Sequence, residues 1–176
     1  MVNKLIINDE LYLDQISDKD VHALAEQISN KKIHEHTLQI PYPYQLSDAV
    51  EWVKFVELQK QEVNSLVNWT IRYQNKLIGG IGQHLKYPDN KEKDEIGYWL
   101  GEAYWGRGIM TGVLKFYCDY LFNTKKMCRL EAPIFKGNIA SQSVLKKNHF
   151  IQESILEKAF EKNDQVFDAI LFVKEK

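Results

Sequence analysis

The stretch EIGYWLGEAYWGRGIMT, residues 95–111, decides how this chain is expected to fold. Residues 95–100 form a short apolar run typical of a strand, and Gly106-Arg107-Gly108 then opens a segment with apolar residues at helical spacing. A helix N-terminus presents unpaired amides and a partial positive charge, and glycine lets the backbone approach an anion. The stretch therefore predicts a strand, a loop and a helix that together hold a pyrophosphate on backbone amides, with Arg107 adding a formal charge.

On either side of this unit the sequence predicts a mixed α/β fold built on one central sheet. The segments 67–73 and 77–85 are expected to form a hairpin around Gln74-Asn75-Lys76. Three antiparallel strands before the glycine loop exclude the doubly wound nucleotide-binding fold. Because no repeat or linker is visible, residues 1–176 are expected to form a single domain. The expected strands are residues 5–13, 67–73, 77–85, 95–100, 127–135, 150–160 and 165–173, and the expected helices start at Ser17, Ser47-Asp48, Gly108 and Asn138.

Charge and cysteine content narrow the function classes. With 23 basic and 24 acidic residues the net charge is −1, which predicts neither nucleic-acid nor membrane binding. Any phosphate binding must therefore come from local geometry. Cys118 and Cys128 form no C-x-x-C pair, and no histidine and cysteine cluster has zinc spacing, so no metal is expected. The N-terminal residues lack the apolar run of a signal peptide, and we expect a cytoplasmic protein.

Taken alone, the G-x-G pattern is weak evidence for a ligand. The dinucleotide fingerprint needs a further glycine downstream, the P-loop signature needs Gly-Lys-Ser/Thr, and neither follows. The wider pattern is more specific: residues 96–100 and 104–111, NIASQSVLKKNHF at 138–150, and IPYPY at 40–44 with D-A-x-x-W at 48–52. Together these segments resemble the GCN5-related N-acetyltransferase (GNAT) family. More narrowly, they resemble its RimJ/RimL-type branch, which acetylates the N-termini of ribosomal proteins.

The resemblance implies a mostly antiparallel sheet, flanked by helices, whose fourth and fifth strands splay apart. Acetyl-CoA, the co-substrate, would lie in this slot with its pantetheine arm bonded to main-chain groups near Trp99 and Leu100. Its pyrophosphate would rest on amides of the glycine loop. Asn138 would contact the pantetheine arm, and Lys147 or its neighbour Lys146 would reach the adenosine phosphate. The residues expected to bind acetyl-CoA are Trp99, Leu100, Trp105, Gly106, Arg107, Gly108, Ile109, Met110, Thr111, Gly112, Asn138 and Lys147.

Three positions depart from the pattern of that family. Trp105 stands where Gln or Arg is usual, which loses a side-chain contact. Met110 replaces a small residue at a place where only the backbone amide is needed. His149 stands where a Gly usually precedes Phe150. Binding of acetyl-CoA is still expected, and its affinity is left open.

The implied chemistry is attack of a neutral amine on the thioester. An α-amine has a pKa of about 7.7–8.0 against about 10.4 for lysine, so an N-terminal acceptor needs only a weak base. Ser141 is the candidate proton donor to the leaving thiolate, unless it only bonds back to Asn138 in a cap. Glu95 is the candidate base, directly or through water, unless it is a solvated acid at the start of its strand. Glu161 is a weaker alternative base.

Aromatic residues are the candidates for binding the acceptor. Tyr42 and Tyr44, in a segment stiffened by two prolines, would line the acceptor end of the slot, unless that segment only connects two helices. Tyr98 and Trp99 flank the slot, and because neighbours on a strand face opposite ways, plain sheet packing is expected for one of them. Tyr98 is taken as the acceptor-binding member.

These features predict an acetyl-CoA-dependent N-acetyltransferase that acts on a primary amine, in the first place a protein N-terminal α-amine, by direct attack in a ternary complex. One alternative keeps the reaction and changes the acceptor to a small amine, namely a polyamine, amino sugar, amino acid or drug. A second is a non-catalytic CoA-binding module, and a third is an interaction protein without a cofactor. Exposed aromatic residues on the closing strands would also allow a homodimer.

Overall fold

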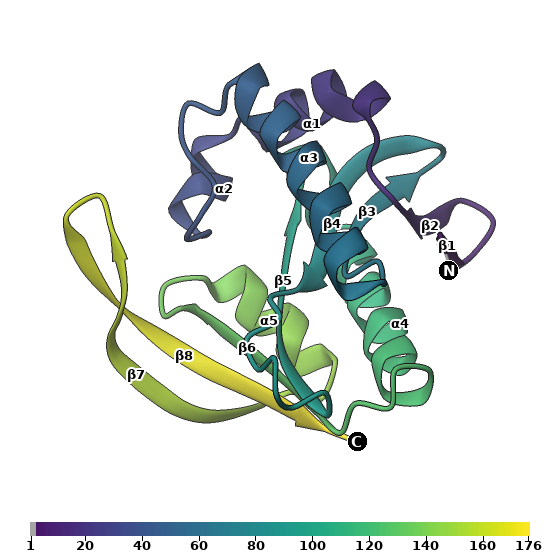
Figure 1. The fold of residues 1–176 in the computed structure, drawn as a ribbon. Coiled ribbons are helices and arrows are strands. Elements are labelled where there is room, and N and C mark those ends of the chain that lie inside the picture. Colours follow the sequence, from purple (N-terminus) through teal and green to yellow (C-terminus); the bar gives the residue numbers. More distant parts are fainter. Residues whose placement is uncertain (1–2) are drawn as a thin grey trace. The chain divides into compact units, whose positions relative to one another are not determined.

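The computed structural model describes residues 3–176, and the chain divides into two compact units that share the strands β4 (Lys76–Gln83) and β5 (Lys93–Leu100). Both units combine helices with sheet, so the fold is mixed α/β, as the sequence predicts (Figure 1). No helix formed by residues 3–176 combines the length and the apolar character that crossing a membrane requires. The first unit contains residues 3–34, 40–82 and 98–107, and the second contains residues 35–39, 83–97 and 108–176.

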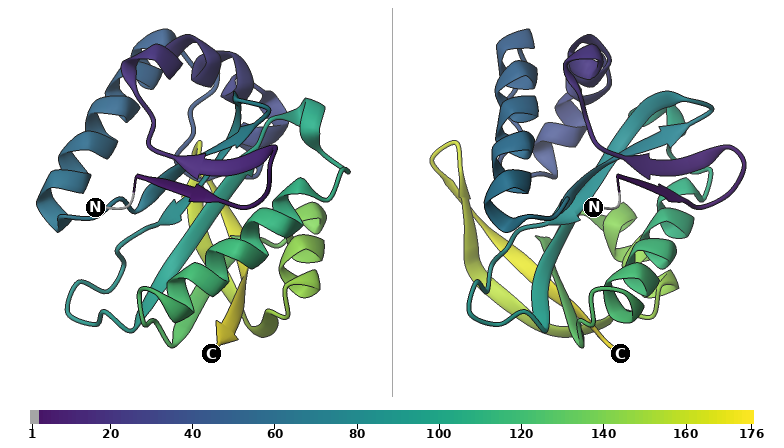
Figure 2. Two further views of the ribbon diagram at one scale, coloured as in Figure 1. Left: turned by 90° about the vertical axis from the view of Figure 1, so that its right-hand side faces the viewer. Right: turned by 45° about the vertical axis from the view of Figure 1, so that its right-hand side comes forward.

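The first unit is built on an antiparallel sheet and carries the N-terminal helices. Its elements besides the shared strands are β1 (Lys4–Ile6), β2 (Leu11–Asp14), the 3₁₀ turn η1 (Asp18–Asp20), α1 (Val21–Ile28), α2 (Lys31–Glu35), α3 (Leu46–Val63), β3 (Asn68–Tyr73) and the 3₁₀ turn η2 (Glu102–Tyr104). The strands follow the order β1-β2-β3-β4, and the end of β5 lies next to β4. Helices α1 and α3 pack against each other, as both views of Figure 2 show.

The second unit contains the helices and strands that follow the glycine loop. Its elements besides the shared strands are α4 (Ile109–Asn123), β6 (Arg129–Phe135), α5 (Ile139–Lys147), β7 (Ile151–Lys162) and β8 (Gln165–Glu175). The strands follow the order β5-β6-β8-β7, with β5 parallel to β6 and the other pairs antiparallel. In Figure 1 the strands β7 and β8 form a long hairpin.

Helix α4 buries the side chains of one face. Val113, Leu114, Tyr117 and Leu121 on this helix are 0% exposed. Their spacing along the helix places them on one face, and full burial of each large apolar side chain contributes about 1.5–3 kcal/mol. This burial stabilises the helix, and within the second unit α4 contacts α5.

The expectation of a single strand at residues 5–13 is wrong, because this segment forms the hairpin of β1 and β2. Asn8 makes the turn between the two strands. Its Oδ1 accepts hydrogen bonds from the amides of Glu10 and Leu11 at 3.0 and 2.8 Å. Asparagine favours turns for this reason, since its side chain satisfies amides of the following residues.

Helix α3 starts earlier than Ser47-Asp48, where the sequence predicted its cap. Gln45 is the N-cap, and Asp48 is the third residue of the helix. The carboxylate of Asp48 accepts a hydrogen bond from the amide of Gln45 at 2.7 Å. The acid therefore closes a capping box from inside the helix, and the N-cap itself was misplaced.

Two glycines of β4 allow the end of β5 to come close. A Cβ at Gly79 would lie 2.5 Å from the carbonyl oxygen of Trp99, and a Cβ at Gly80 would lie 2.7 Å from its Nε1. The indole of Trp99 therefore packs on the backbone of β4. Of Tyr98 and Trp99, it is Trp99 whose side chain has the sheet-packing role that was expected for one of them.

Strands β5 and β6 splay apart, as the sequence predicts for its fourth and fifth strands. Their register pairs are Lys93↔Arg129, Asp94↔Leu130 and Glu95↔Glu131. Beyond the last of these pairs β5 continues to Leu100 and β6 continues to Phe135. Backbone pairing thus joins the two strands at their start and ends after these three pairs. Beyond this point the backbone groups on the facing edges of β5 and β6 are not paired with each other.

Candidate active site

The glycine loop has the backbone conformation that the sequence predicts. Gly106 and Gly108 have φ angles of 71° and 74°, in the left-handed region that residues with side chains rarely adopt. A Cβ built on either would meet no heavy atom within 4 Å, so backbone conformation and not crowding requires glycine there. Gly108 is the N-cap of α4, and the loop therefore leads directly into the helix.

The first turn of α4 presents backbone amides that precede the helical hydrogen-bond ladder. The first bond of this ladder runs from the amide of Gly112 to the carbonyl of Gly108 at 3.1 Å. The three amides before it belong to Ile109, Met110 and Thr111. Met110 buries its side chain, with 7% exposed, so only its backbone faces the loop. This described turn contains no acidic residue, and it offers N–H donors and the positive end of the helix dipole to an anion.

Two large side chains of the first unit hold the loop before Gly108. The Nε1 of Trp105 donates a hydrogen bond to the carbonyl of Leu100 at 2.6 Å, which closes the connection around η2. The guanidinium carbon of Arg107 lies 5.2 Å from the ring centre of Tyr73 and 5.7 Å from that of Tyr104. These distances fit cation–π contacts, so the positive charge is held beside the glycines by two aromatic faces.

Asn138 caps α5, as the sequence predicts. Its Oδ1 accepts a hydrogen bond from the amide of Ser141 at 3.0 Å. The bond comes from the main-chain N–H of Ser141, so the cap does not depend on the hydroxyl. Ser141 is 8% exposed. The cap fixes where this residue lies in the second unit, and the role of its hydroxyl as a proton donor stays a prediction.

Asn148, for which no role was predicted, fastens α5 to α4. The residue is 3% exposed, and its Nδ2 donates to the carbonyls of Thr111 at 3.2 Å and Val144 at 2.9 Å. Thr111 lies in the first turn of α4, so this contact brings the end of α5 next to the start of α4. Lys147, predicted to reach the adenosine phosphate, is exposed in that last turn of α5.

The same end of α5 closes in a Schellman motif. The amide of Phe150 donates to the carbonyl of Leu145 at 3.1 Å, and the amide of His149 donates to that of Lys146 at 3.0 Å. His149 has a φ angle of 63°, so it occupies the left-handed position of the motif. This conformation explains why glycine is usual at this position. Histidine has a side chain, so adopting the same conformation costs it backbone strain.

Glu95 is not a solvated acid at the start of its strand. It is the third residue of β5, its side chain is 16% exposed, and its Oε1 lies 2.6 Å from Nδ1 of His84. The main chains of the two residues also pair, because the amide of His84 donates to the carbonyl of Glu95 at 2.9 Å. The imidazole lies over Gly97, where a Cβ would be 2.6 Å from its Nε2. Glu95 is therefore paired with a histidine whose side chain is half exposed.

A second carboxylate lies opposite Glu95, where β5 and β6 separate. Glu131 is its register partner. The hydroxyl of Tyr87 donates to Glu131 at 2.5 Å, and the Nε of Arg129 donates to it at 2.7 Å. Burial alone would raise the pKa of Glu131, but these two hydrogen bonds outweigh it and hold the pKa below its ordinary value. The bond to Glu131, with burial, raises the pKa of Tyr87 to about 12, so this tyrosine stays a hydrogen-bond donor.

The tyrosines predicted at the acceptor end belong to the first unit. Tyr42 is 49% exposed, and its ring centre lies 5.9 Å from that of His34. Burial, reinforced by the charge of Asp48, raises the pKa of Tyr44 to about 12, which keeps its hydroxyl protonated. Tyr98 is half-buried on β5. The acceptor-binding role of these three tyrosines stays a prediction.

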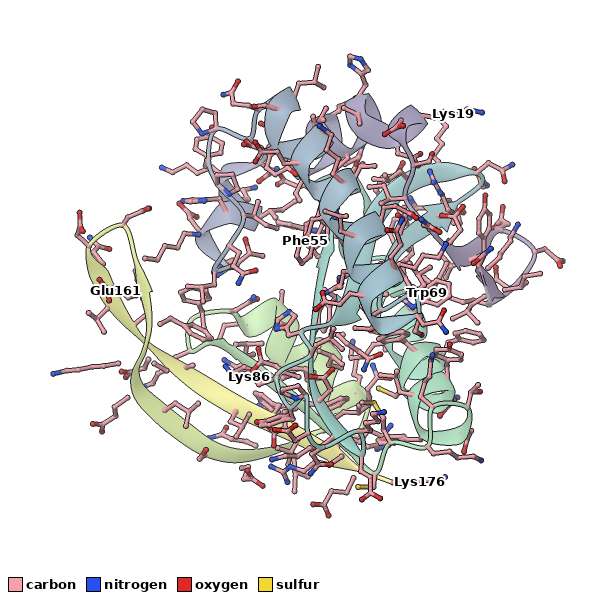
Figure 3. All side chains as sticks on the ribbon, in the orientation of Figure 1. Lys19, Phe55, Trp69, Lys86, Glu161 and Lys176 are labelled. Carbon is pink, nitrogen blue, oxygen red and sulfur yellow. The ribbon has the colours of Figure 1, made fainter. Side chains whose placement is uncertain are left out.

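The structure gathers part of the predicted site into the second unit. Glu95, Asn138, Ser141 and Lys147 lie in the same unit as the first turn of α4. Glu161, the weaker alternative base, is exposed near the tip of the β7–β8 hairpin (Figure 3). Among residues 3–176, no three His, Cys, Asp or Glu side chains are grouped as a metal ion would require.

Sequence reasoning missed His84 and Glu131, and it assigned no contact to Asn148. One signal could have identified His84. The amide of Gly101 donates to the carbonyl of Ile78 at 2.8 Å, which fixes the antiparallel register of β4 and β5. In this register Glu95 lies opposite His84. Glu131 and Asn148 depend on which elements pack together, and no local pattern marks them.

Comparisons with known proteins identify the family of this chain and its fold. The family model described as "Acetyltransferase (GNAT) domain" matches residues 10–151. The uncharacterized N-acetyltransferase YoaA of Bacillus subtilis (strain 168) is 26% identical over 170 residues, which cover 96% of this chain and 94% of YoaA. The ribosomal-protein-serine acetyltransferase of Escherichia coli (strain K12) is 24% identical over 186 residues, which cover 99% of this chain and 97% of the relative. The solved structure of RimL, a ribosomal L7/L12 α-N-protein acetyltransferase in complex with coenzyme A, has a TM-score of 0.87 at 24% identity, covers 98% of both chains and confirms the predicted fold.

Proposed function

Because this chain belongs to the GNAT family of acetyltransferases, whose model matches residues 10–151, we propose that it transfers the acetyl group of acetyl-CoA to the α-amine of a protein N-terminus. Family membership makes the chain an N-acetyltransferase that uses acetyl-CoA, and the acceptor is the proposed part. We also propose that residues 1–176 act as one catalytic domain in the cytoplasm. The support for the acceptor is the relative named as a ribosomal-protein-serine acetyltransferase, which is similar along 99% of this chain.

The observation that carries the proposal is the pair of left-handed glycines at the start of α4. Gly106 and Gly108 turn the chain so that the amides of the first helical turn are presented together. A pyrophosphate is the group that such an arrangement binds best, because N–H donors and the helix dipole act on the same charge. In the proposed complex the amides from Gly106 to Gly112 hold the pyrophosphate, and Lys147 meets the adenosine phosphate.

The reaction needs little from the protein besides positioning and two proton transfers. The amine nitrogen forms a bond with the thioester carbon, the carbon–sulfur bond breaks, and the thiolate leaves with the electron pair. The nitrogen must lose one proton, and the thiolate must gain one. In the proposed roles Glu95 draws the proton from the amine, directly or through water, and Ser141 supplies a proton to the thiolate. Binding both substrates in one geometry supplies much of the remaining acceleration.

The test is a comparison of acceptors. The purified protein and acetyl-CoA are incubated with a lysine-free peptide that starts with a free serine, with the same peptide blocked at its N-terminus and extended by one lysine, and with spermidine, glucosamine and free serine. We expect mass spectrometry to find one acetyl group on the first peptide and none on the second. Preferred acetylation of a small amine would replace the proposed acceptor, and binding of acetyl-CoA without turnover on any acceptor would indicate a CoA-binding module.

A further inference from the structure

Beside Glu95 the structure holds a second proton-accepting group that faces the freed part of β5. We propose that His84, through its Nε2, is the group that takes the proton from the acceptor amine, while Glu95 orients the imidazole and stabilises its charged form. The inference rests on the proposed function, because it assigns a residue to that reaction. It replaces direct contact between Glu95 and the amine by contact through the ring of His84.

The hydrogen bond between the two side chains sets which nitrogen accepts a proton. A carboxylate only accepts hydrogen bonds, so Nδ1 of His84 carries the hydrogen that it donates to Glu95 at 2.6 Å. In the neutral ring the other nitrogen, Nε2, then has the free lone pair. Glu95 therefore selects the tautomer of His84 in which Nδ1 carries the hydrogen and Nε2 can accept a proton.

The position of Nε2 follows from Gly97. A Cβ at this residue would lie 2.6 Å from Nε2 and 3.1 Å from Cε1 of His84, so the ring lies directly over the glycine. Gly97 comes just after the last register pair of β5 with β6, Glu95↔Glu131. The basic nitrogen thus lies over the first stretch of β5 that β6 does not pair, where backbone groups are open to a substrate.

The exposure of the two side chains fits this division of roles. The side chain of His84 is 50% exposed, whereas that of Glu95 is 16% exposed. An amine arriving from solvent therefore meets the imidazole more readily than the carboxylate. Imidazole also changes charge between about pH 5 and 8, so it both accepts a proton from an α-amine and returns it to water.

Charged and titratable groups from several elements surround the pair. Glu131 on β6 lies opposite Glu95 and is held ionised by Arg129 and Tyr87. Lys93 lies over the ring of Tyr87, with its Nζ 3.8 Å from the ring centre. Asp94, on the opposite face of β5, accepts hydrogen bonds from the amides of Leu85 and Lys86. Glu131 therefore adds a second negative charge to the part of the sheet that carries Glu95.

The proton balance of the step is complete. As the nitrogen bonds to the thioester carbon, one of its protons moves to Nε2 of His84, and the imidazolium releases it to water. The thiolate that leaves takes one proton from water, directly or through the Ser141 hydroxyl, which then regains its proton from water. The amine has lost one proton, coenzyme A has gained one, and His84 returns to its neutral form.

The test measures kcat, and KM for the serine peptide and for acetyl-CoA, between pH 5.5 and 9. Four proteins are compared: wild type, His84→Ala, Gly97→Ala and the control His22→Ala, which removes an exposed histidine of α1. We expect His84→Ala to lower kcat by about 100-fold or more, with an unchanged KM for acetyl-CoA and loss of the pH dependence near neutrality. Added imidazole should restore part of the rate in His84→Ala and have no effect on His22→Ala. Gly97→Ala should also lower kcat, because the new methyl group displaces the ring while both titratable groups remain.

Two results would overturn the proposal, and they differ from failure of the proposed function. A His84→Ala enzyme with the wild-type kcat and pH profile removes His84 from the reaction while the transferase function stands. A loss of rate in His84→Ala that imidazole does not relieve, with normal kcat in Gly97→Ala, assigns the histidine a structural role only. If the wild-type protein acetylates no acceptor although it is folded, the proposed function fails and the role of His84 fails with it.

Discussion

The side-chain amide of Asn148 donates a hydrogen bond to the main-chain carbonyl of Thr111 at 3.2 Å, and so joins the end of α5 to the first turn of α4. The same amide group donates to Val144 at 2.9 Å, and the residue is 3% exposed. A buried amide with two carbonyl partners cannot be removed without leaving those carbonyls short of donors. The two halves of the proposed pyrophosphate and adenosine site therefore depend on one residue.

Replacing Asn148 by Ala should lower both stability and acetyl-CoA affinity. We expect a loss of about 1–3 kcal/mol in the free energy of unfolding, because two part-buried carbonyls lose a hydrogen-bond donor. The affinity should fall because Lys147 is no longer held beside the first turn of α4. Urea unfolding and calorimetric titration measure the two effects. Asn123→Ala, at the exposed end of α4, is the matched control, and an Asn148→Ala protein that behaves like this control contradicts the account.

Replacing His149 by Gly should stabilise the protein. The histidine holds a φ angle of 63°, which costs a residue with a side chain about 1–2 kcal/mol. Glycine removes this strain but loses about 0.5–1 kcal/mol through the greater freedom of the unfolded chain, so the expected gain is about 0.5–1 kcal/mol. The urea midpoint should rise for His149→Gly and fall for His149→Val, whose branched side chain tolerates this conformation least. Equal midpoints for the two variants would show that the conformation carries no strain.

The buried ion pair of Arg72 and Asp20 should make the free energy of unfolding depend on pH in the acidic range. Arg72 bonds both oxygens of Asp20, at 2.7 and 2.9 Å, and Ser17 donates to the same carboxylate. Burial alone would raise the pKa of Asp20, but these bonds lower it below its ordinary 3.8. The pKa of Asp20 is lower in the folded state than in the unfolded state. The contribution of this ion pair to stability is therefore complete above about pH 4, and it is lost as the pH falls through the folded-state pKa. Burial raises the pKa of Asp14, so its contribution runs in the opposite direction.

Asp20→Asn isolates this effect. Removing one partner of a buried ion pair costs about 3 kcal/mol near neutral pH. In Asp20→Asn the buried charge of Arg72 is balanced only by its remaining ion pair with Asp14. Unfolding by urea between pH 2.5 and 7 should show a smaller difference between wild type and variant as the pH falls below 4. A difference that stays constant over this range would mean that Asp20 is not ionised in the native pair.

The parts of the site that depend on local geometry could be predicted from the sequence. Gly108 was predicted because a helix that starts after a left-handed turn requires glycine at that place, and its φ angle is 74°. Asn138 was predicted as a cap because its side chain needs only the first turn of its own helix. The splay of β5 from β6 came from the family resemblance and is confirmed, although neither strand alone contains a signal for it.

The parts that depend on register and packing were missed. His84 faces Glu95 only because β4 and β5 pair in one register, and a shift by one residue would turn its side chain to the other face. The sequence pattern predicts one strand where β1 and β2 form a hairpin, because the turn depends on how Asn8 bonds two later amides. The start of α3 was placed at Ser47-Asp48 because an acid can close a capping box from the third helical position as well as cap the helix directly.

The central claim is that the left-handed glycines before α4 form the binding site for acetyl-CoA, and a calorimetric titration of wild type and Gly108→Asp tests it most directly. The substitution would place a side chain at a φ angle of 74° and a negative charge beside the amides. The matched control is Asn123→Asp, which adds the same charge at the other end of α4. We predict that wild type and the control bind acetyl-CoA and that Gly108→Asp, still folded, loses about 100-fold in affinity, or about 2.7 kcal/mol. Equal affinity in all three proteins, or no binding by wild type, would contradict the account.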